Sequence, residues 1–147
     1  MATILPARAP WHLWAVGVIS LLWNAMGAID YSLTELHNQA YFDMGGMTPE
    51  MIAYFNGFPA WAVAAWAIGV WSCLAGSIVL LVRSRLAAPA FALSLLGLAV
   101  TDYFSIAVAH PAAFDTTAST IFRIVLFAVT VFLTIYAWRM KAAGVLR

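Results

Sequence analysis

Three charged residues interrupt otherwise apolar runs of this sequence and are its strongest candidates for chemistry: Asp30, Asp102 and Arg123. A charge at the centre of a membrane costs about 2.5–3.5 kcal/mol on insertion scales, so such residues are usually paired or functional. At 1.5 Å per residue, Arg123 lies about 9 Å and Asp102 about 12 Å below the outer ends of two consecutive predicted helices. We therefore expect an ion pair between Asp102 and Arg123, which Asp30 on the first predicted helix is placed to join.

Two interpretations of this charge cluster remain open from the sequence. In the first, the ion pair locks the third and fourth predicted helices together, and Asp30 simply reaches water. In the second, the cluster is a polar site open to the periplasm, because ionisable groups inside a membrane are functional candidates by default. The surplus carboxylate is then protonated, solvated or bound to a cation.

Aromatic and amide side chains near the cluster are candidates for lining a ligand. Deep indole rings pack well but need a partner for their N–H group, and they can stack on a sugar or another ring. Ordinary packing between helices is the alternative explanation. The candidates are Trp23, Asn24, Tyr31, Trp66 and Tyr103.

The sequence lacks the patterns that many enzymes and metal sites require. It contains no phosphate-binding loop, no H-E-x-x-H and no serine elbow, and its histidines do not form a facing pair for haem. Cys73 is the single cysteine, which excludes an internal disulfide and a cysteine-clustered metal site. The net charge of +1 gives nucleic-acid binding no electrostatic support. We expect no catalytic residue, metal, cofactor, nucleic-acid partner or enzymatic activity.

Four long apolar runs must position these residues. The chain is 65% hydrophobic and 9% charged, which leaves too much apolar surface for a soluble monomer. Each run reaches the roughly 20 residues that a helix needs to cross a membrane. Short connections make consecutive helices antiparallel neighbours. The predicted fold is an all-α membrane protein, one domain over 1–147, with four transmembrane helices in an antiparallel bundle at about 11–31, 59–82, 86–109 and 117–138.

The charges outside these runs predict the orientation of the helices. Six of the seven Lys and Arg residues lie at the N-terminus, in the second connection or in the C-terminal tail: Arg8, Arg83, Arg85, Arg139, Lys141 and Arg147. The first and third connections carry only acids: Glu35, Asp43, Glu50 and Asp115. Because cytoplasmic loops are enriched in Lys and Arg, we expect both termini in the cytoplasm and the acidic loops in the periplasm.

The first periplasmic loop contains the start signal of a short amphipathic helix. Thr48 suits the N-cap, Pro49 the first helical position and Glu50 the positive helix end. Gly57 would end this helix after Asn56. We expect it to lie on the membrane surface, with a lid over the bundle as the alternative.

Small and polar residues recur at intervals of three and four along each predicted span. This spacing puts them on one helix face, and small residues let membrane helices approach closely. We expect these stripes to face inward: Gly17, Ser20, Asn24, Gly27 and Tyr31; Ala65, Gly69, Ser72 and Gly76; Ser94, Gly97, Thr101 and Ser105; Thr120, Arg123, Phe127, Thr130 and Thr134.

Several segments resemble a family of small four-helix inner-membrane proteins of proteobacteria, whose members often carry the label "sugar transporter". The matching segments are Pro10-Trp-His-Leu-Trp14, Leu21-Leu-Trp-Asn-Ala-Met-Gly-Ala-Ile-Asp-Tyr31, Phe58-Pro-Ala-Trp61, Trp66-Ala-Ile-Gly-Val-Trp71 and Ser94-Leu-Leu-Gly-Leu-Ala-Val100. The resemblance is clearest in the first two-thirds of the chain. It implies a multi-pass protein of the bacterial inner membrane and carries over no site residues.

The sequence leaves three functions open. The leading expectation is a non-enzymatic accessory or assembly subunit that packs against a larger membrane complex, because much apolar surface accompanies no evident chemistry. The second is a small-solute carrier, for sugars as the resemblance implies, which would need self-association because four helices enclose little space. The third is a lipid- or quinone-binding protein, based on the deep aromatic residues. Membrane lipids contact the protein in all three.

Overall fold

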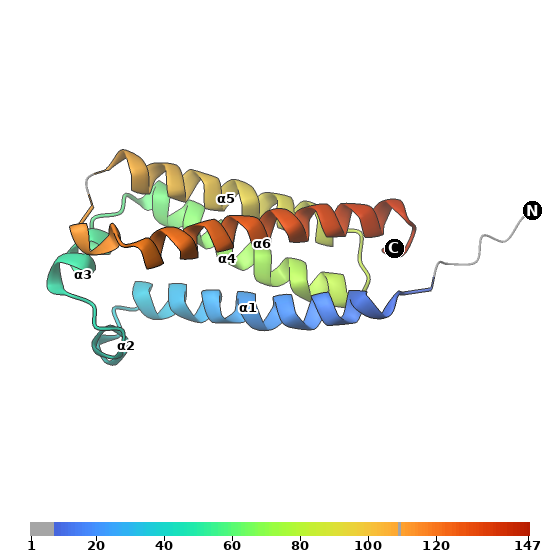
Figure 1. Ribbon diagram of the computed structural model, residues 1–147, viewed down its shortest axis with the longest axis horizontal. Coiled ribbons are helices and arrows are strands. Elements are labelled where there is room, and N and C mark those ends of the chain that lie inside the picture. The colour runs from blue at the N-terminus through green and yellow to red at the C-terminus, as the bar shows by residue number, and fades with distance from the viewer. Residues whose placement is uncertain (1–7, 109) are drawn as a thin grey trace, which may run out of the picture.

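Long helices make up most of the molecule (Figure 1). The computed structural model describes residues 8–108 and 110–147, and every regular element in those ranges is helical. The long helices are α1 (Trp11–Glu35), α4 (Ala60–Leu81), α5 (Ala87–Ala107) and α6 (Thr117–Ala142). They have between 21 and 26 residues and are apolar enough to cross a membrane, which confirms that the four predicted spans are long helices. The predicted end of the third span, at residue 109, lies outside the described residues.

Local sequence signals set most of the helix ends. Pro10 and Pro59 precede α1 and α4, where a missing N–H leaves no hydrogen bond unmade. The hydroxyl of Thr116 accepts a hydrogen bond of 3.0 Å from the N–H of Ser119 and caps α6. After α4, Arg83 adopts a left-handed conformation with φ of 60°, which turns the chain toward α5.

Helix α4 is the centre of the bundle, because it packs against both α1 and α5, and α5 in turn packs against α6. The small-residue stripes of α1, α4 and α5 contribute to these contacts as expected, but the expectation is wrong for Thr120 and Arg123 of the α6 stripe, which are exposed. The buried members of the stripes are Gly17, Ser20 and Asn24 on α1, Gly69 and Gly76 on α4, Ser94 and Gly97 on α5, and Thr130 on α6. Close helix approach at small residues therefore holds the frame together.

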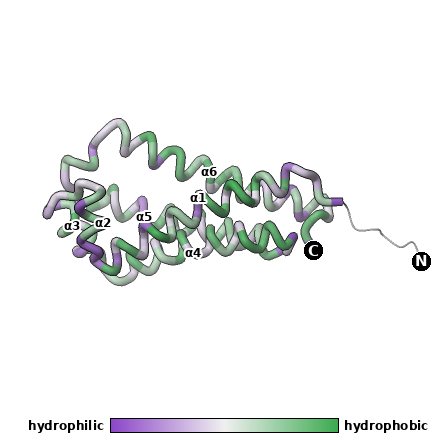
Figure 2. Tube along the Cα trace, turned by 90° about the horizontal axis from the view of Figure 1, so that it is seen from below, coloured by the Kyte–Doolittle hydropathy of each residue, from purple (hydrophilic) through white to green (hydrophobic). Residues whose placement is uncertain are grey.

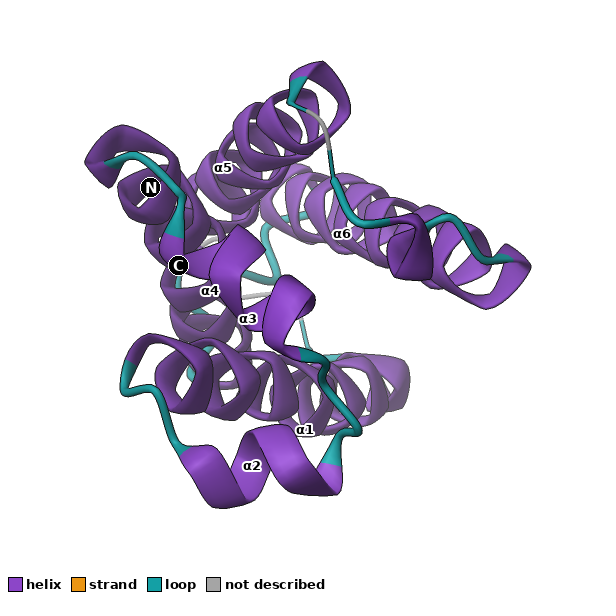
Figure 3. Ribbon diagram, turned by 90° about the vertical axis from the view of Figure 1, so that its left-hand side faces the viewer, coloured by secondary structure: helices purple, strands orange, loops and turns teal. Residues whose placement is uncertain are grey.

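Helix α6 packs along only part of its length. Its second half buries Thr130, Leu133 and Ala137, whereas the stretch from Thr117 to Val125 contains no buried residue. Figures 2 and 3 show this first half leaning away from α1, while the two helices converge toward the other end. The bundle is consequently open on the side between α1 and α6.

The two ends of the bundle carry opposite charge. We call one the acidic end, where all six acidic residues of the chain lie: Asp30, Glu35, Asp43, Glu50, Asp102 and Asp115. The basic end carries Arg8, Arg83, Arg85, Arg139, Lys141 and Arg147. There the C-terminal tail folds back, and the N–H of Arg147 donates to the carbonyl of Arg83 at 2.7 Å.

Three short elements cover the acidic end: α2 (Gln39–Met44), α3 (Pro49–Asn56) and the 3-10 turn η1 (Ala112–Phe114). The predicted start of α3 is confirmed, because the Thr48 hydroxyl accepts from the N–H of Met51. The ring of Phe55 stacks on Trp66 of α4 with centroids 5.8 Å apart, and Phe58 meets Phe104 of α5 at 4.9 Å. These ring contacts hold α3 and the following Phe58 against the acidic end of the bundle (Figure 3), although α3 itself contains no buried residue. The expected position of α3 on the membrane surface stays a prediction.

Candidate functional site

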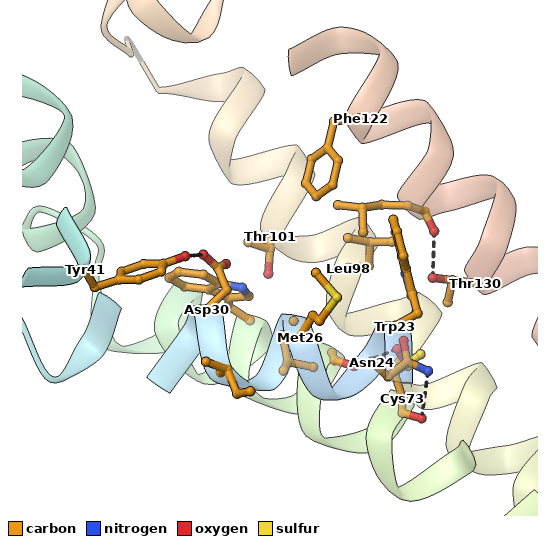
Figure 4. A pocket seen from close by; sticks show the side chains of 17 residues that line it. Trp23, Asn24, Met26, Asp30, Tyr41, Cys73, Leu98, Thr101, Phe122 and Thr130 are labelled. Carbon is orange, nitrogen blue, oxygen red and sulfur yellow. Dashed lines mark hydrogen bonds between the residues drawn. The ribbon is translucent and has the colours of Figure 1, made fainter. Parts of the chain in front are cut away.

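The four long helices surround a cavity of about 510 Å³, which we call the lateral cavity. Figure 4 shows Trp23, Met26 and Asp30 along one side of it, with Phe122 and Thr130 of α6 across from them. At its rim, Met26 of α1 is 68% exposed and Phe122 of α6 is 56% exposed. The cavity therefore opens sideways, through the gap between α1 and α6.

Polar groups in the inner part of the lateral cavity are engaged within the protein. The amide of Asn24 donates to the Ser77 hydroxyl at 2.8 Å and to the Cys73 carbonyl at 3.3 Å. The Ser94 hydroxyl donates to the Gly69 carbonyl at 2.6 Å, and the Thr130 hydroxyl bonds within α6. In the part of the chain that the structure describes, every buried side-chain nitrogen and oxygen has a partner. The inner cavity thus presents a largely apolar lining to a ligand.

The part of the cavity lined by Asp30 and Tyr41, which we call its mouth, is polar because it contains a carboxylate. Asp30 is exposed and lines the cavity, and its Oδ1 accepts a short hydrogen bond from the hydroxyl of Tyr41 on α2. This hydrogen bond, followed by burial and by the charge of Asp30, raises the pKa of Tyr41 to about 12. The contact holds α2 against the end of α1 and fixes one carboxylate oxygen.

The expected ion pair between α5 and α6 is present. Nε of Arg123 lies 3.6 Å from Oδ1 of Asp102, with the two side chains 46% and 20% exposed. Asp30 does not join it: within residues 8–108 and 110–147, no ion pair links Asp30 to Arg123. The structure separates the pair between α5 and α6 from the exposed Asp30 at the cavity mouth, which is the arrangement of the first interpretation.

The five candidate ligand-lining residues divide in the same way. Trp23, Asn24 and Trp66 line the lateral cavity. Tyr31 lies outside the lining, with its ring perpendicular to that of Trp66 at 4.9 Å. Tyr103 is 72% exposed and does not line the cavity, so the expectation for it and for Tyr31 is wrong.

Sequence reasoning missed much of the α6 side of the cavity. Phe122 and Leu126 resemble any other apolar residue of a membrane helix, and nothing in the sequence sets them apart. The spacing of small residues puts Gly27 on the inward stripe, but it does not indicate that Gly27 leaves unfilled space beside the helix. A Cβ atom on Gly27 would meet no atom within 4 Å, although this glycine lines the cavity.

Metal chemistry finds no support in the arrangement of these side chains. Among the described residues, no group of three His, Cys, Asp or Glu side chains is placed to hold a metal ion.

Comparison of the chain with protein-family models, with curated proteins and with solved structures finds no match. The resemblance to the proteobacterial family stays a prediction, and the function has to be argued from the lateral cavity itself.

Proposed function

We propose that this chain is a non-enzymatic membrane protein that binds an amphipathic, lipid-like small molecule in the lateral cavity. The observation that carries the proposal is the cavity itself, whose volume of about 510 Å³ falls in the usual range of small-molecule sites, roughly 300–1,000 Å³. An opening between two membrane-spanning helices faces lipid, so the ligand enters sideways from the bilayer. Its apolar part lies deep in the cavity, and its polar part stays near Asp30 at the mouth.

The placement of the cavity in the membrane follows from the charges at the two ends. We propose that the basic end lies in the cytoplasm of a bacterium, with both termini, and that the acidic end lies in the periplasm. The four spans then alternate in direction as an antiparallel bundle in the inner membrane. In this orientation the mouth of the lateral cavity lies in the outer leaflet.

The chemistry of the cavity favours a lipid- or quinone-like ligand over a sugar. A sugar needs several free hydrogen-bond partners, and in this cavity the polar groups of Asn24, Ser94 and Thr130 already bond within the protein. The rings of Trp23, Trp66 and Phe122 supply apolar wall instead. This order of preference differs from the sequence-based one, in which an accessory subunit came first.

A cavity-filling substitution tests the proposal. Gly27 lines the cavity, and a Cβ atom added there meets nothing within 4 Å, so we expect Gly27→Phe to fold and to direct its ring into the cavity. Ala75→Phe adds the same bulk at an exposed position of α4 and is the matched control. Native mass spectrometry of protein released from native membranes should show a bound small molecule on the wild type and on the control.

The same experiment has a clear contrary outcome. We expect the bound mass on Gly27→Phe to fall at least tenfold in occupancy, because the ring takes the ligand's space. Equal occupancy on Gly27→Phe and on the wild type, or no bound small molecule on either, would contradict ligand binding in the cavity.

A second candidate function is the accessory subunit, and one observation favours it. The stretch of α6 from Thr117 to Val125 has no buried residue within this chain, so a helix of a larger complex has room to pack there. Mild-detergent extraction followed by native mass spectrometry separates the two functions. A stoichiometric protein partner that is retained on Gly27→Phe supports the subunit function, whereas a lone chain with a bound small molecule supports the first.

A further inference from the structure

The acidic end of the bundle creates a strongly negative field around the cavity mouth. All six acidic residues of the chain lie there, and Arg123 is the one Lys or Arg at that end, which leaves five uncompensated negative charges when histidine is neutral. Summed charge of this kind raises the local concentration of cations and repels anions. A ligand that approaches this end is therefore selected by charge before it makes any contact.

At the mouth itself, one negative charge lacks a counter-charge. Asp30 lines the lateral cavity and accepts a hydrogen bond from Tyr41, which is a neutral donor. Arg123, the one cation at this end, is paired with Asp102. Among the described residues, no Lys or Arg forms an ion pair with Asp30. The carboxylate at the cavity mouth is thus available to a cation from outside the chain.

The surroundings of Asp30 fit an organic cation better than a metal ion. One carboxylate alone cannot supply the six or more oxygen ligands that Ca²⁺ prefers. Aromatic side chains line the same cavity, namely Trp23, Trp66 and Tyr41, and ring faces attract ammonium groups. Leu98 and Leu126 add apolar wall for a tail. A carboxylate, aromatic rings and apolar side chains therefore line one cavity.

From this combination we infer that the ligand of the lateral cavity is a cationic amphiphile, with an ammonium head at Asp30 and an apolar tail between α1 and α6. The inference rests on the proposed function, because it names the chemical class of the molecule that the cavity binds. A neutral ligand would leave the Asp30 carboxylate uncompensated, and an anionic one would meet the negative field. The ammonium group belongs either to a lipid headgroup or to a free amphiphile.

The test uses dodecyltrimethylammonium as the probe and calorimetric titration of the full-length protein in a maltoside detergent. We expect saturable binding to the wild type and a dissociation constant at least tenfold higher for Asp30→Asn, which keeps an oxygen for the Tyr41 hydrogen bond but removes the charge. Asp43→Asn removes one charge from the same end at a residue that does not line the cavity, so its effect should stay within twofold. Asp30→Glu should retain most of the binding.

Further variants make the outcomes distinguishable. Tyr41→Phe removes the hydrogen bond without changing the charge, so binding close to wild type shows that the charge of Asp30 is responsible. If Gly27→Phe abolishes binding while Asp30→Asn leaves it unchanged, the cavity binds a ligand but the ammonium inference is wrong. If neither variant changes binding, the proposed function fails as well.

The source of the ammonium group is assigned by competition. Nanodiscs of phosphatidylethanolamine that displace the probe, where nanodiscs of phosphatidylglycerol do not, identify a lipid headgroup as the natural occupant. Failure of both lipids to compete assigns the site to a free amphiphile. Tighter binding of a short-chain phosphatidylglycerol than of the matching phosphatidylethanolamine, each titrated without the cationic probe, would overturn the inference, because an anionic headgroup would then be preferred.

Discussion

Gly97 of α5 lies directly against Gly69 of α4, with no side chain between the two backbones. A Cβ atom on Gly97 would stand 2.6 Å from the backbone nitrogen of Gly69 and 2.7 Å from the carbonyl oxygen of Ala65. The Ser94 hydroxyl adds a hydrogen bond to the Gly69 carbonyl at the same crossing. Helices α4 and α5 therefore form a closely packed pair, and α1 and α6 diverge on either side of it to leave the lateral cavity.

The substitution Gly97→Ala should weaken this crossing. The new methyl group meets backbone atoms that cannot rotate away, and overpacking of this kind costs about 1–3 kcal/mol. The measurement is the free energy of unfolding in SDS titrations of the detergent-solubilised protein. Gly27→Ala is the matched control, since its methyl group meets nothing within 4 Å. Equal stability of the two alanine variants would refute the close approach.

The hydrogen bond between Asn24 and Ser77 should contribute modestly to the contact between α1 and α4. Hydrogen bonds between membrane helices average about 0.6 kcal/mol in double-mutant cycles and reach about 1.7 kcal/mol. We expect a coupling in that range when Asn24→Ala and Ser77→Ala are combined and unfolding is measured. The same cycle with Ser20, whose hydroxyl bonds within α1, should give no coupling to Ser77.

Breaking the pair of Asp102 and Arg123 should cost more stability than the pair itself contributes, because one charge is left without its partner. At 3.6 Å and with Arg123 46% exposed, the pair itself contributes about 1 kcal/mol or less. Arg123→Gln leaves a carboxylate without its partner, whereas Arg123→Gln combined with Asp102→Asn leaves none. We expect the double variant to be more stable than the Arg123→Gln single variant in SDS unfolding; the reverse order would count against this explanation.

The pair of His110 and Asp115, outside the spans, should respond to pH. Nε2 of His110 lies 2.8 Å from Oδ1 of Asp115, and this hydrogen bond raises the pKa of His110 above its ordinary value of 6.5. Its contribution to stability is complete below pH 6.5 and disappears as the pH rises through the higher pKa of the folded state. Proton NMR titration should show the His110 pKa return toward 6.5 in Asp115→Asn. An unchanged His110 pKa in that variant would exclude the contact.

The sequence predicts the four spans and the start of α3 well, because these depend on local signals. Length and hydropathy define a membrane helix, and Thr48 with Pro49 marks a helix start wherever it occurs. The Asp102–Arg123 pair was also predictable, since both residues lie at similar depth on helices joined by a short connection. The exposure of Tyr103 could also have been predicted, because Tyr103 follows inward-facing Thr101 by two residues and two residues turn about 200° around a helix.

The lateral cavity was beyond the reach of sequence reasoning, because it depends on how whole helices lean. Asp30 on α1 does not join the pair of Asp102 and Arg123, and α1 and α6 diverge at this end (Figure 3). That divergence results from close contacts elsewhere, at Gly69 and Gly97 and around Thr130, Leu133 and Ala137. No residue at the cavity mouth has a sequence feature that indicates the divergence of α1 and α6.

Occupancy of the lateral cavity by an apolar tail is the central claim, and photo-crosslinking in membranes tests it most directly. A dodecyl amine probe with a diazirine near its tail end should label cavity residues, chiefly Met26, Leu98 and Leu126, and the labelling should disappear in Gly27→Phe. Adducts spread evenly over the outward positions Ile19, Ile78 and Ile135, and unaffected by Gly27→Phe, would contradict the claim.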